Sequence, residues 1–341
     1  MIIQSSRFTP YRLPLRRPWV SHHDRLAWRE GWLVRLRAED LEGIGDCAPL
    51  PEAGTETLAE AESWLKRLLP ALAGQEPGDL LRHLDNHVHI PPAVRCGIET
   101  ALIDLLSKGR GIGIAQWINP DALEGVRVNA NLGALDDAVL ERLDEADGCS
   151  VIKLKLGLAP VADEIGRLQR LSGRLPPGIR LRLDANQAWG LEEAIRMLDA
   201  VEDLPVESIE EPLASPDSVA LRRLQQRTPI PLALDESLVL LGRDALLADP
   251  PVRRVVLKPM ALGGAMAALE FARRCQAAGM ETVITTTIDS AIGVWTAVHL
   301  AAALGKAGAG LAHGLATSRW LAEDLAAPPR IEGGVISLAD G

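Results

Sequence analysis

From about residue 125 onward the chain repeats one pattern: a short run rich in β-branched residues, a polar turn, and a stretch with helical spacing. The runs lie at residues 126–132, 150–157, 179–186, 206–213, 231–237, 253–259, 281–289 and 308–315. Alternating strands and helices favour a parallel sheet, and eight strands at a repeat of roughly 25 residues favour a sheet that closes on itself. The repeat therefore predicts a β/α barrel.

The residues before the repeat have a different texture. Residues 2–13 and 32–37 read as strands, whereas the stretch that begins at Thr55 and residues 93–108 carry apolar side chains at helical spacing. The end of the chain lacks the periodicity of a closing helix and looks like a hairpin. We predict an α/β fold: a TIM-like barrel of eight strands at residues 116–320 and a small α+β domain at residues 1–115, with a C-terminal segment at residues 321–341 that returns to it.

Charge and hydropathy argue against several classes of function. The net charge of the 341 residues is −10, which argues against nucleic acid or an anionic membrane as a partner because both require basic patches. We find no apolar run long enough to span a bilayer and no secretion signal, so we expect a cytoplasmic protein. A small molecule is the expected partner, and a homo-oligomer remains open.

Charged residues stand at the carboxyl ends of consecutive predicted strands. They are, in order, Lys155, Asp184, Glu210, Asp235 and Lys258, at steps of 29, 26, 25 and 23 residues. Each step is one strand–helix unit, so these side chains follow one another around one rim of the barrel. Catalytic side chains of such barrels lie at this rim. A single acidic residue at a strand end is usually solvated or caps a helix, but five charges in this order are hard to explain as surface residues.

The chemistry of this set indicates a metal site. Three carboxylates at one rim repel one another, so they must protonate or bind a cation, and oxygen ligands favour Mg²⁺, Ca²⁺ or Mn²⁺ over zinc. A metal that holds a substrate carboxylate acidifies the neighbouring C–H bond, and a lysine can remove that proton. Lys155 and Lys258 stand on strands at opposite sides of the barrel. Lys153 shares a strand face with Lys155 and is expected to assist it by like-charge repulsion.

A function of another class is a catalytically inactive barrel that serves as a binding module. Such a protein is expected to have lost at least one ligand or lysine. All five rim residues are present, which favours an enzyme.

The rim residues lie in longer motifs that resemble a known family. KLKLG, LRLDANQAW, IEEPL, LALDES and LKPM resemble the motifs of the enolase superfamily, in its muconate-lactonizing-enzyme subgroup. The resemblance covers nearly the whole chain. It implies a (β/α)7β barrel with an α+β capping domain completed by the C-terminal segment. It also implies Mg²⁺, with Mn²⁺ as a substitute, on Asp184, Glu210 and Asp235, and acid/base chemistry by Lys155 and Lys258.

Stretches outside the barrel motifs resemble the o-succinylbenzoate synthase family of menaquinone biosynthesis. They are RLPLRRPW, WREGWLVRL, IGDCAPLPEAGTETL and AHGLATSRWLAEDLAAPPRIEGG. The resemblance implies the syn dehydration of a succinyl-cyclohexadiene carboxylate to o-succinylbenzoate, with Lys155 as base and then acid and Lys258 stabilising the intermediate. Arg182 and Asn186 are expected to orient the metal ligand or the substrate.

Other residues are candidates for substrate contacts. Thr286 and Thr287 end the seventh strand and are expected to hold a succinyl carboxylate, while Gly314 makes room for the ligand. The loop at His22-His23 is expected to lie over the site. Residues 52–55 read Glu-Ala-Gly-Thr, where the family usually has glycine, an aromatic residue or histidine, and serine.

An N-succinylamino-acid racemase or a dipeptide epimerase is the alternative, because both use the same metal and lysines. Many dipeptide epimerases carry an Asp-x-Asp signature at the last strand, and residues 313–317 read His-Gly-Leu-Ala-Thr instead. The sequence therefore favours the synthase over the epimerase.

Overall fold

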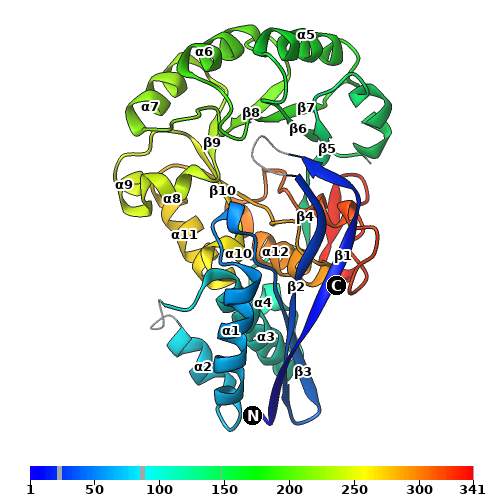
Figure 1. Ribbon diagram of the computed structural model, residues 1–341, viewed down its shortest axis with the longest axis vertical. Coiled ribbons are helices and arrows are strands. Elements are labelled where there is room, and N and C mark those ends of the chain that lie inside the picture. The colour runs from blue at the N-terminus through cyan, green and yellow to red at the C-terminus, as the bar shows by residue number, and fades with distance from the viewer. Residues whose placement is uncertain (21–24, 85–88, 147, 341) are drawn as a thin grey trace.

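The protein consists of a barrel, in the upper part of Figure 1, and a smaller cap, in its lower part. The computed structural model describes residues 1–20, 25–84, 89–146 and 148–340. Two long strands of the cap, β1 (Ser5–Val20) and β2 (Arg25–Ala38), extend alongside the barrel. The cap therefore reaches the barrel rim through its first two strands.

The cap is an antiparallel sheet in the order β1-β2-β3, packed against helices. Its other elements are β3 (Leu41–Cys47), α1 (Leu58–Leu68), α2 (Pro77–Leu84), α3 (Pro92–Arg110) and α4 (Ile114–Ile118). The capping box of Thr57 and Glu60 starts α1. Close packing of α3 on β3 needs glycine, because a Cβ at Gly45 would lie 1.9 Å from the Gly97 carbonyl oxygen. Strand β1 runs past Pro14, beyond its predicted end, with a register shift between Pro14 and Trp19.

The barrel sheet has seven parallel strands in the order β11-β10-β9-β8-β7-β6-β5, as the repeat predicted. They are β5 (Ala130–Ala134), β6 (Val151–Lys155), β7 (Arg180–Asp184), β8 (Val206–Glu210), β9 (Leu232–Leu234), β10 (Arg254–Leu257) and β11 (Glu281–Ile284). The outer helices are α5 (Val161–Ser172), α6 (Leu191–Ala200), α7 (Ser218–Arg227), α8 (Ser237–Leu241), α9 (Arg243–Ala248), α10 (Pro259–Leu262), α11 (Ala265–Ala277) and α12 (Ala291–Ala303). A 3₁₀ helix at Val139–Ala146 takes the place of a helix after β5.

The eighth predicted strand is reduced to single bridges. Gly314 pairs in parallel with Thr285, and His313 pairs in parallel with Val128. Backbone bonds from Gly314 N to the Ile284 oxygen and from Asn129 N to the His313 oxygen join the two edges of the sheet. The barrel is thus closed by a two-residue contact, and the prediction of a strand across 308–315 was too long.

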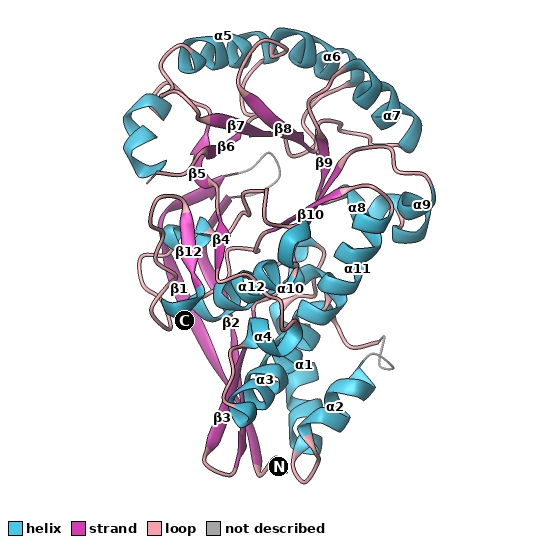
Figure 2. Ribbon diagram, turned by 180° about the vertical axis from the view of Figure 1, so that it is seen from behind, coloured by secondary structure: helices cyan, strands magenta, loops and turns pink. Residues whose placement is uncertain are grey.

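The first predicted barrel strand divides into two elements. Its beginning forms β4 (Gly125–Arg127), which pairs antiparallel with β12 (Val335–Ser337), and only β5 joins the barrel. Figure 2 shows β4 and β12 side by side. The C-terminal segment meets the cap at the bridge between Leu15 and Leu321, while Ile336 packs in the barrel core. The domain boundaries themselves stay a prediction.

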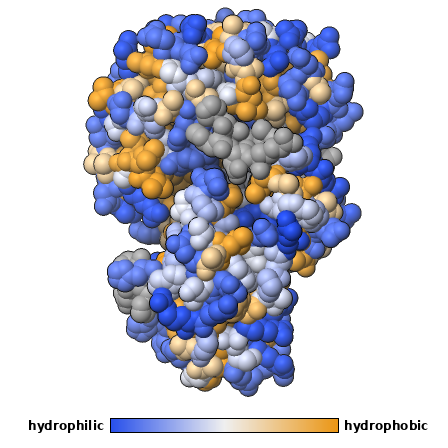
Figure 3. Space-filling model, in the orientation of Figure 1, coloured by the Kyte–Doolittle hydropathy of each residue, from blue (hydrophilic) through white to orange (hydrophobic). Residues whose placement is uncertain are grey.

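The two lobes have separate apolar cores. One cluster runs from Ala115 to Ile336 and fills the barrel, and another, from Ile3 to Leu105, fills the cap and includes Met260 from α10. The face in Figure 3 is mainly hydrophilic, with hydrophobic side chains in several separate patches. None of the helices in the described part of the chain is long and apolar enough to cross a membrane.

Candidate active site

A cavity of about 360 Å³ lies where the cap covers the carboxyl ends of the barrel strands. Its lining includes ten of the predicted site residues: Lys153, Lys155, Arg182, Asn186, Glu210, Asp235, Lys258, Thr286, Thr287 and Gly314. Asp184 is fully buried behind the lysines that contact it. The cap contributes Trp19, Leu26, Leu50, Glu52 and Ala53. Residues predicted from the barrel repeat thus meet in one enclosed space.

Strand register explains why the charged residues meet. Lys155 pairs with Asp184 across β6 and β7, and Asp184 pairs with Glu210 across β7 and β8. Glu210 pairs with Ala233 on β9, two residues before Asp235. Because side chains two residues apart share a face of a strand, Asp235 points to the same side as its neighbours.

Two lysines from β6 hold the carboxylates of β7 and β8. Lys153 Nζ lies 2.7 Å from Asp184 Oδ2 and 2.8 Å from both Glu210 oxygens. Lys155 Nζ lies 2.6 Å from Asp184 Oδ2 and 2.7 Å from Asn186 Oδ1. Lys153 therefore bridges two carboxylates, and Lys155 is held by one carboxylate and one amide.

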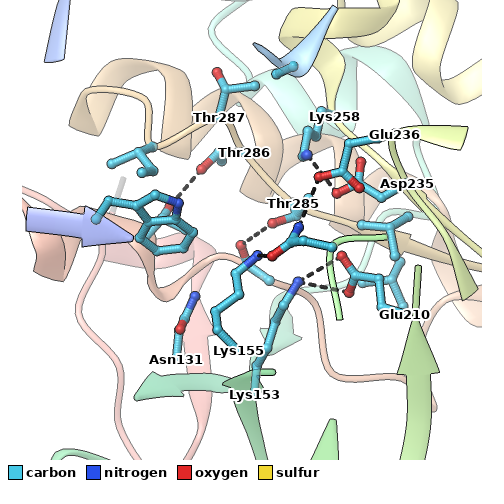
Figure 4. A pocket seen from close by; sticks show the side chains of 18 of the residues that line it. Asn131, Lys153, Lys155, Glu210, Asp235, Glu236, Lys258, Thr285, Thr286 and Thr287 are labelled. Carbon is cyan, nitrogen blue, oxygen red and sulfur yellow. Dashed lines mark hydrogen bonds and ion pairs between the residues drawn. The ribbon is translucent and has the colours of Figure 1, made fainter. Parts of the chain in front are cut away.

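The third lysine comes from the other side. Figure 4 shows Lys258 beside Asp235 and Glu236, across the cavity from Lys155. Lys258 Nζ lies 2.6 Å from Asp235 Oδ2. The Asn186 amide connects Lys155 to Glu236. Its oxygen accepts from Lys155, and its nitrogen donates to Glu236 Oε1 at 3.1 Å. Two ammonium groups thus face a common space from opposite walls.

Neighbouring charges shift the pKa values of these lysines. Burial alone would lower the pKa of Lys153, but the charges of Asp184 and Glu210 raise it above the ordinary value. The pKa of Lys258 is raised in the same way, against burial, chiefly by Asp235. The sequence predicted that the charge of Lys153 assists Lys155 by repulsion. The carboxylates of Asp184 and Glu210 oppose this effect, because they balance the positive charge of Lys153.

Burial and mutual repulsion raise the pKa values of two of the three carboxylates. Burial and then the charge of Asp184 raise the pKa of Glu210. Burial and then the charge of Glu236 raise the pKa of Asp235 well above its usual range. Only Asp184 has a lowered pKa, because the two ammonium groups on it outweigh burial.

The donor set fits a hard divalent cation by its chemistry. Three buried or nearly buried carboxylates on adjacent strands offer oxygen ligands only. Among the described residues, no three acidic, histidine or cysteine side chains converge closely enough to hold an ion as they stand. The ammonium groups of Lys153 and Lys258 contact oxygens of all three of these carboxylates.

Arg182 lies one layer below these carboxylates. Its guanidinium donates to Glu207 at 3.1 Å and to Asn129 Oδ1 at 3.0 Å, and Arg254 donates to Glu207 at 2.5 Å. Burial raises the pKa of Glu207, but the two guanidinium groups outweigh it and lower that pKa to about 2. Arg182 therefore forms part of an ionic floor of the cavity, where it bonds Glu207 and Asn129.

The predicted substrate-binding threonines have partners of their own. Thr286 Oγ1 lies 2.6 Å from Thr317 Oγ1, and Thr287 Oγ1 donates to Asp289 at 2.5 Å. A Cβ at Gly314 would lie 2.5 Å from Thr285 Oγ1. The absence of a side chain at Gly314 thus leaves room for Thr285. The hydroxyl of Thr286 contacts that of Thr317, and both residues line the cavity.

Backbone strain gathers at the same rim. Asn186, Gln187, Glu211 and Ile288 all have positive φ, at 44°, 63°, 49° and 61°. Such conformations cost about 1–3 kcal/mol each and persist only where surrounding contacts hold them. The cost is greatest for a β-branched residue such as Ile288.

Sequence reasoning missed several residues that line the cavity. Asn131 lies in β5, the first barrel strand, and Glu236 adjoins Asp235, so the strand repeat could have indicated both. Trp19 comes from the cap, and its ring centroid lies 5.3 Å from Lys155 Nζ; no periodicity pointed to it. His22 and His23 lie outside the described residues.

Comparison with known proteins matches both lobes. Residues 137–341 match the family described as enolase C-terminal domain-like, and residues 3–105 match the family described as MenC, N-terminal domain. The chain belongs to the enolase superfamily. Muconate cycloisomerases are among the relatives of this enolase-superfamily protein, which lies in the muconate-lactonizing-enzyme subgroup.

Individual relatives carry two kinds of activity. The o-succinylbenzoate synthase of Thermobifida fusca is 34% identical over 211 residues, covering 60% of this chain and 63% of that protein. The o-succinylbenzoate synthase of Pectobacterium atrosepticum is 29% identical over 300 residues, covering 85% of this chain and 84% of that protein. The N-succinyl Arg/Lys racemase of Bacillus cereus superposes with a TM-score of 0.88 at 23% identity, covering 99% of this chain and 94% of that chain. This last likeness shows the fold alone.

Proposed function

We propose that this chain is an o-succinylbenzoate synthase of menaquinone biosynthesis. It would remove water from a succinyl-cyclohexadiene carboxylate by breaking the C–H bond next to the carboxylate and a C–O bond on the same face. The observation that carries the proposal is the match of the cap to the MenC N-terminal domain, since the rim residues alone fit the whole subgroup.

The metal in this proposal is Mg²⁺, with Mn²⁺ as a substitute, held by Asp184, Glu210 and Asp235. When bound, a divalent cation neutralises these carboxylates and stabilises negative charge on the substrate carboxylate. Their position at the ends of β7, β8 and β9 supports this assignment.

Lys155 is the proposed base. Its Nζ faces the cavity and is oriented by Asn186, so it can take the proton next to the carboxylate and return it to the leaving hydroxyl as water departs. Lys258, from the opposite wall, would stabilise negative charge as an ammonium ion. The cap contributes Trp19, Leu26, Leu50, Glu52 and Ala53 to the cavity wall and so covers part of the site.

An N-succinylamino-acid racemase or dipeptide epimerase is the second candidate. One observation favours it: two lysines face the cavity from opposite sides, as removal of a proton from one face and its return to the other require.

The deciding experiment is a direct assay of the purified protein with Mg²⁺. Formation of o-succinylbenzoate is measured beside racemisation of N-succinylated amino acids and epimerisation of dipeptides. We expect o-succinylbenzoate formation to have the highest kcat/KM. If no o-succinylbenzoate forms while racemisation or epimerisation proceeds, the proposal is wrong and the second candidate replaces it.

A further inference from the structure

A single buried arginine joins the cap to the barrel beside the cavity. Arg29, on β2, is 2% exposed. Its Nε donates to the carbonyl oxygens of Thr287 and Ile288 at 3.2 and 3.1 Å. Its Nη1 donates to the Pro49 oxygen at 2.7 Å, and its Nη2 to the Ala48 oxygen. With a further bond to the Glu30 oxygen, one side chain gathers backbone acceptors from three separate segments.

Two of these segments border the cavity, one from the cap and one from the barrel. The cap segment at Ala48 and Pro49 leads directly into Leu50 and Glu52, which line the cavity. The barrel segment after β11 lines it from residue 285 to residue 288. The Arg29 guanidinium therefore fixes where the cap wall stands relative to the barrel wall.

The barrel segment needs such a restraint. Ile288 has a φ of 61° although it is β-branched, and this conformation persists only if neighbouring contacts hold it. Arg29 bonds the carbonyl oxygens of Thr287 and Ile288, directly at the strained residue.

A second cap side chain holds Ser290, two residues after Ile288 in the same segment. Asp46, on β3, accepts from Ser290 N at 3.1 Å and from Ser290 Oγ at 2.7 Å. Tyr11 donates to its other oxygen at 2.7 Å. Ser290 is the residue before α12, so Asp46 ties the start of that helix to the cap sheet.

Lysine cannot replace the guanidinium in this position. Arginine has five N–H donors in a planar fork, whereas lysine has three on one atom. The five backbone oxygens and the Thr287 hydroxyl around Arg29 use all three of its nitrogens.

We propose that Arg29 and Asp46 are positioning residues that set the separation of the cap and barrel walls and thereby select the distal group of the carboxylate substrate. This inference rests on the proposed function for the identity of that substrate. Neither residue touches the reacting atoms, and both act through segments that do line the cavity.

The test compares Arg29→Lys with Arg142→Lys as a matched control. Arg142 also donates to backbone oxygens, those of Leu132 and Ala134 at 3.0 and 2.7 Å, but these belong to the barrel strand β5 and not to the cap. We expect Arg29→Lys to change the ratio of kcat/KM for o-succinylbenzoate formation to that for N-succinylamino-acid racemisation by about tenfold, mainly through KM, while the control stays within about twofold of wild type. Equal loss on both substrates, or no change in either, would refute selection by this pair.

Hydrogen exchange tests the positions of the two walls without any substrate. We expect amides of residues 48–53 and 285–290 to exchange together about tenfold faster in Arg29→Lys and unchanged in Arg142→Lys. If neither segment, or only one, is affected, the two walls are not joined through Arg29. This measurement can be made even if no succinyl substrate is turned over. Failure of the positioning role of Arg29 is therefore distinguishable from failure of the proposed function.

Ser290→Ala removes one bond to Asp46 and leaves the backbone bond in place, so it keeps the test open if Arg29→Lys does not fold. We expect faster exchange around residues 287–290 and a smaller change of the kcat/KM ratio in the same direction. Wild-type exchange and an unchanged ratio in this variant would overturn the part assigned to Asp46.

Discussion

The rim of the cavity has two unlike halves. From β6 to β10 it carries Lys153, Lys155, Asp184, Glu210, Asp235 and Lys258, all within ion-pair distance of a partner. From β11 to β5, under the cap, it carries threonine hydroxyls, asparagine amides, Gly314 and Trp19. The first half offers charge and proton transfer, whereas the second offers shape and hydrogen bonds.

The difference separates general chemistry from selection. A metal and two lysines can activate the C–H bond of any bound carboxylate, so the charged half fits the synthase and the racemase equally well. The neutral half and the cap surround the remainder of the cavity, and they have the means to discriminate between substrates by size and polarity. Variants in the two halves are therefore expected to differ in kind.

The largest effect is expected for Lys155→Ala. We predict that kcat/KM falls by at least about a thousandfold for o-succinylbenzoate formation and for racemisation alike. Both reactions begin with removal of the proton next to the substrate carboxylate. Lys66→Ala, an exposed lysine of α1, serves as the control. Loss on one substrate only would break the proposed division between the halves.

Asp184→Asn should weaken metal binding, with a smaller effect than loss of the base. An amide lacks the negative charge of a ligand carboxylate, so we expect the Kd for Mg²⁺ to rise by about a hundredfold in calorimetry. Asp249→Asn, at an exposed pair with Arg222, should bind as wild type does. Unchanged affinity in Asp184→Asn would remove this residue from the ligand set.

The buried carboxyl group of Asp289, beside the neutral half, should make the free energy of unfolding depend on pH. Burial, and then the charge of Asp46, raises the pKa of Asp289 from 3.8 to about 6, with Arg29 opposing the shift. Between these two values the folded state keeps a proton that the unfolded state has released, so stability falls as pH rises through the window. The loss amounts to at most about 3 kcal/mol.

Asp289→Asn has no such proton to lose. We therefore expect its free energy of unfolding in urea to change less than that of wild type between about pH 4 and about pH 7. Asp249→Asn should keep the wild-type dependence. An identical pH dependence in Asp289→Asn would show that another group is responsible.

The smallest effect is expected for Trp19→Leu, which tests an aromatic contact between the halves. The Trp19 ring lies over Lys155 Nζ and packs edge-on against Trp320 at 4.7 Å. Loss of a cation–π contact is worth about 1 kcal/mol, so we expect kcat/KM to fall about fivefold for both substrates. A change in their ratio instead would assign Trp19 to selection.

The sequence predicted all of the charged half but only Thr286, Thr287 and Gly314 of the neutral half, for a physical reason. Asp184, Glu210 and Asp235 end strands whose spacing is set by the strand–helix repeat, so their meeting follows from register. Trp19 reaches the cavity, and Arg29 reaches the segments beside it, from the cap by tertiary packing, which leaves no periodic trace. The eighth strand was overestimated because residues 308–315 follow the spacing of the repeat but contain no β-branched residue, and His313 and Gly314 form the bridges that close the barrel.

The most direct test of the central claim, that Lys155 takes the substrate proton, is hydrogen exchange of the substrate itself. Substrate is incubated with Mg²⁺ in deuterium oxide, and deuterium next to its carboxylate is followed by mass spectrometry for wild type, Lys155→Ala and Lys66→Ala. We predict exchange with wild type and Lys66→Ala and none above background with Lys155→Ala. Exchange retained in Lys155→Ala would contradict the assignment and place the base elsewhere.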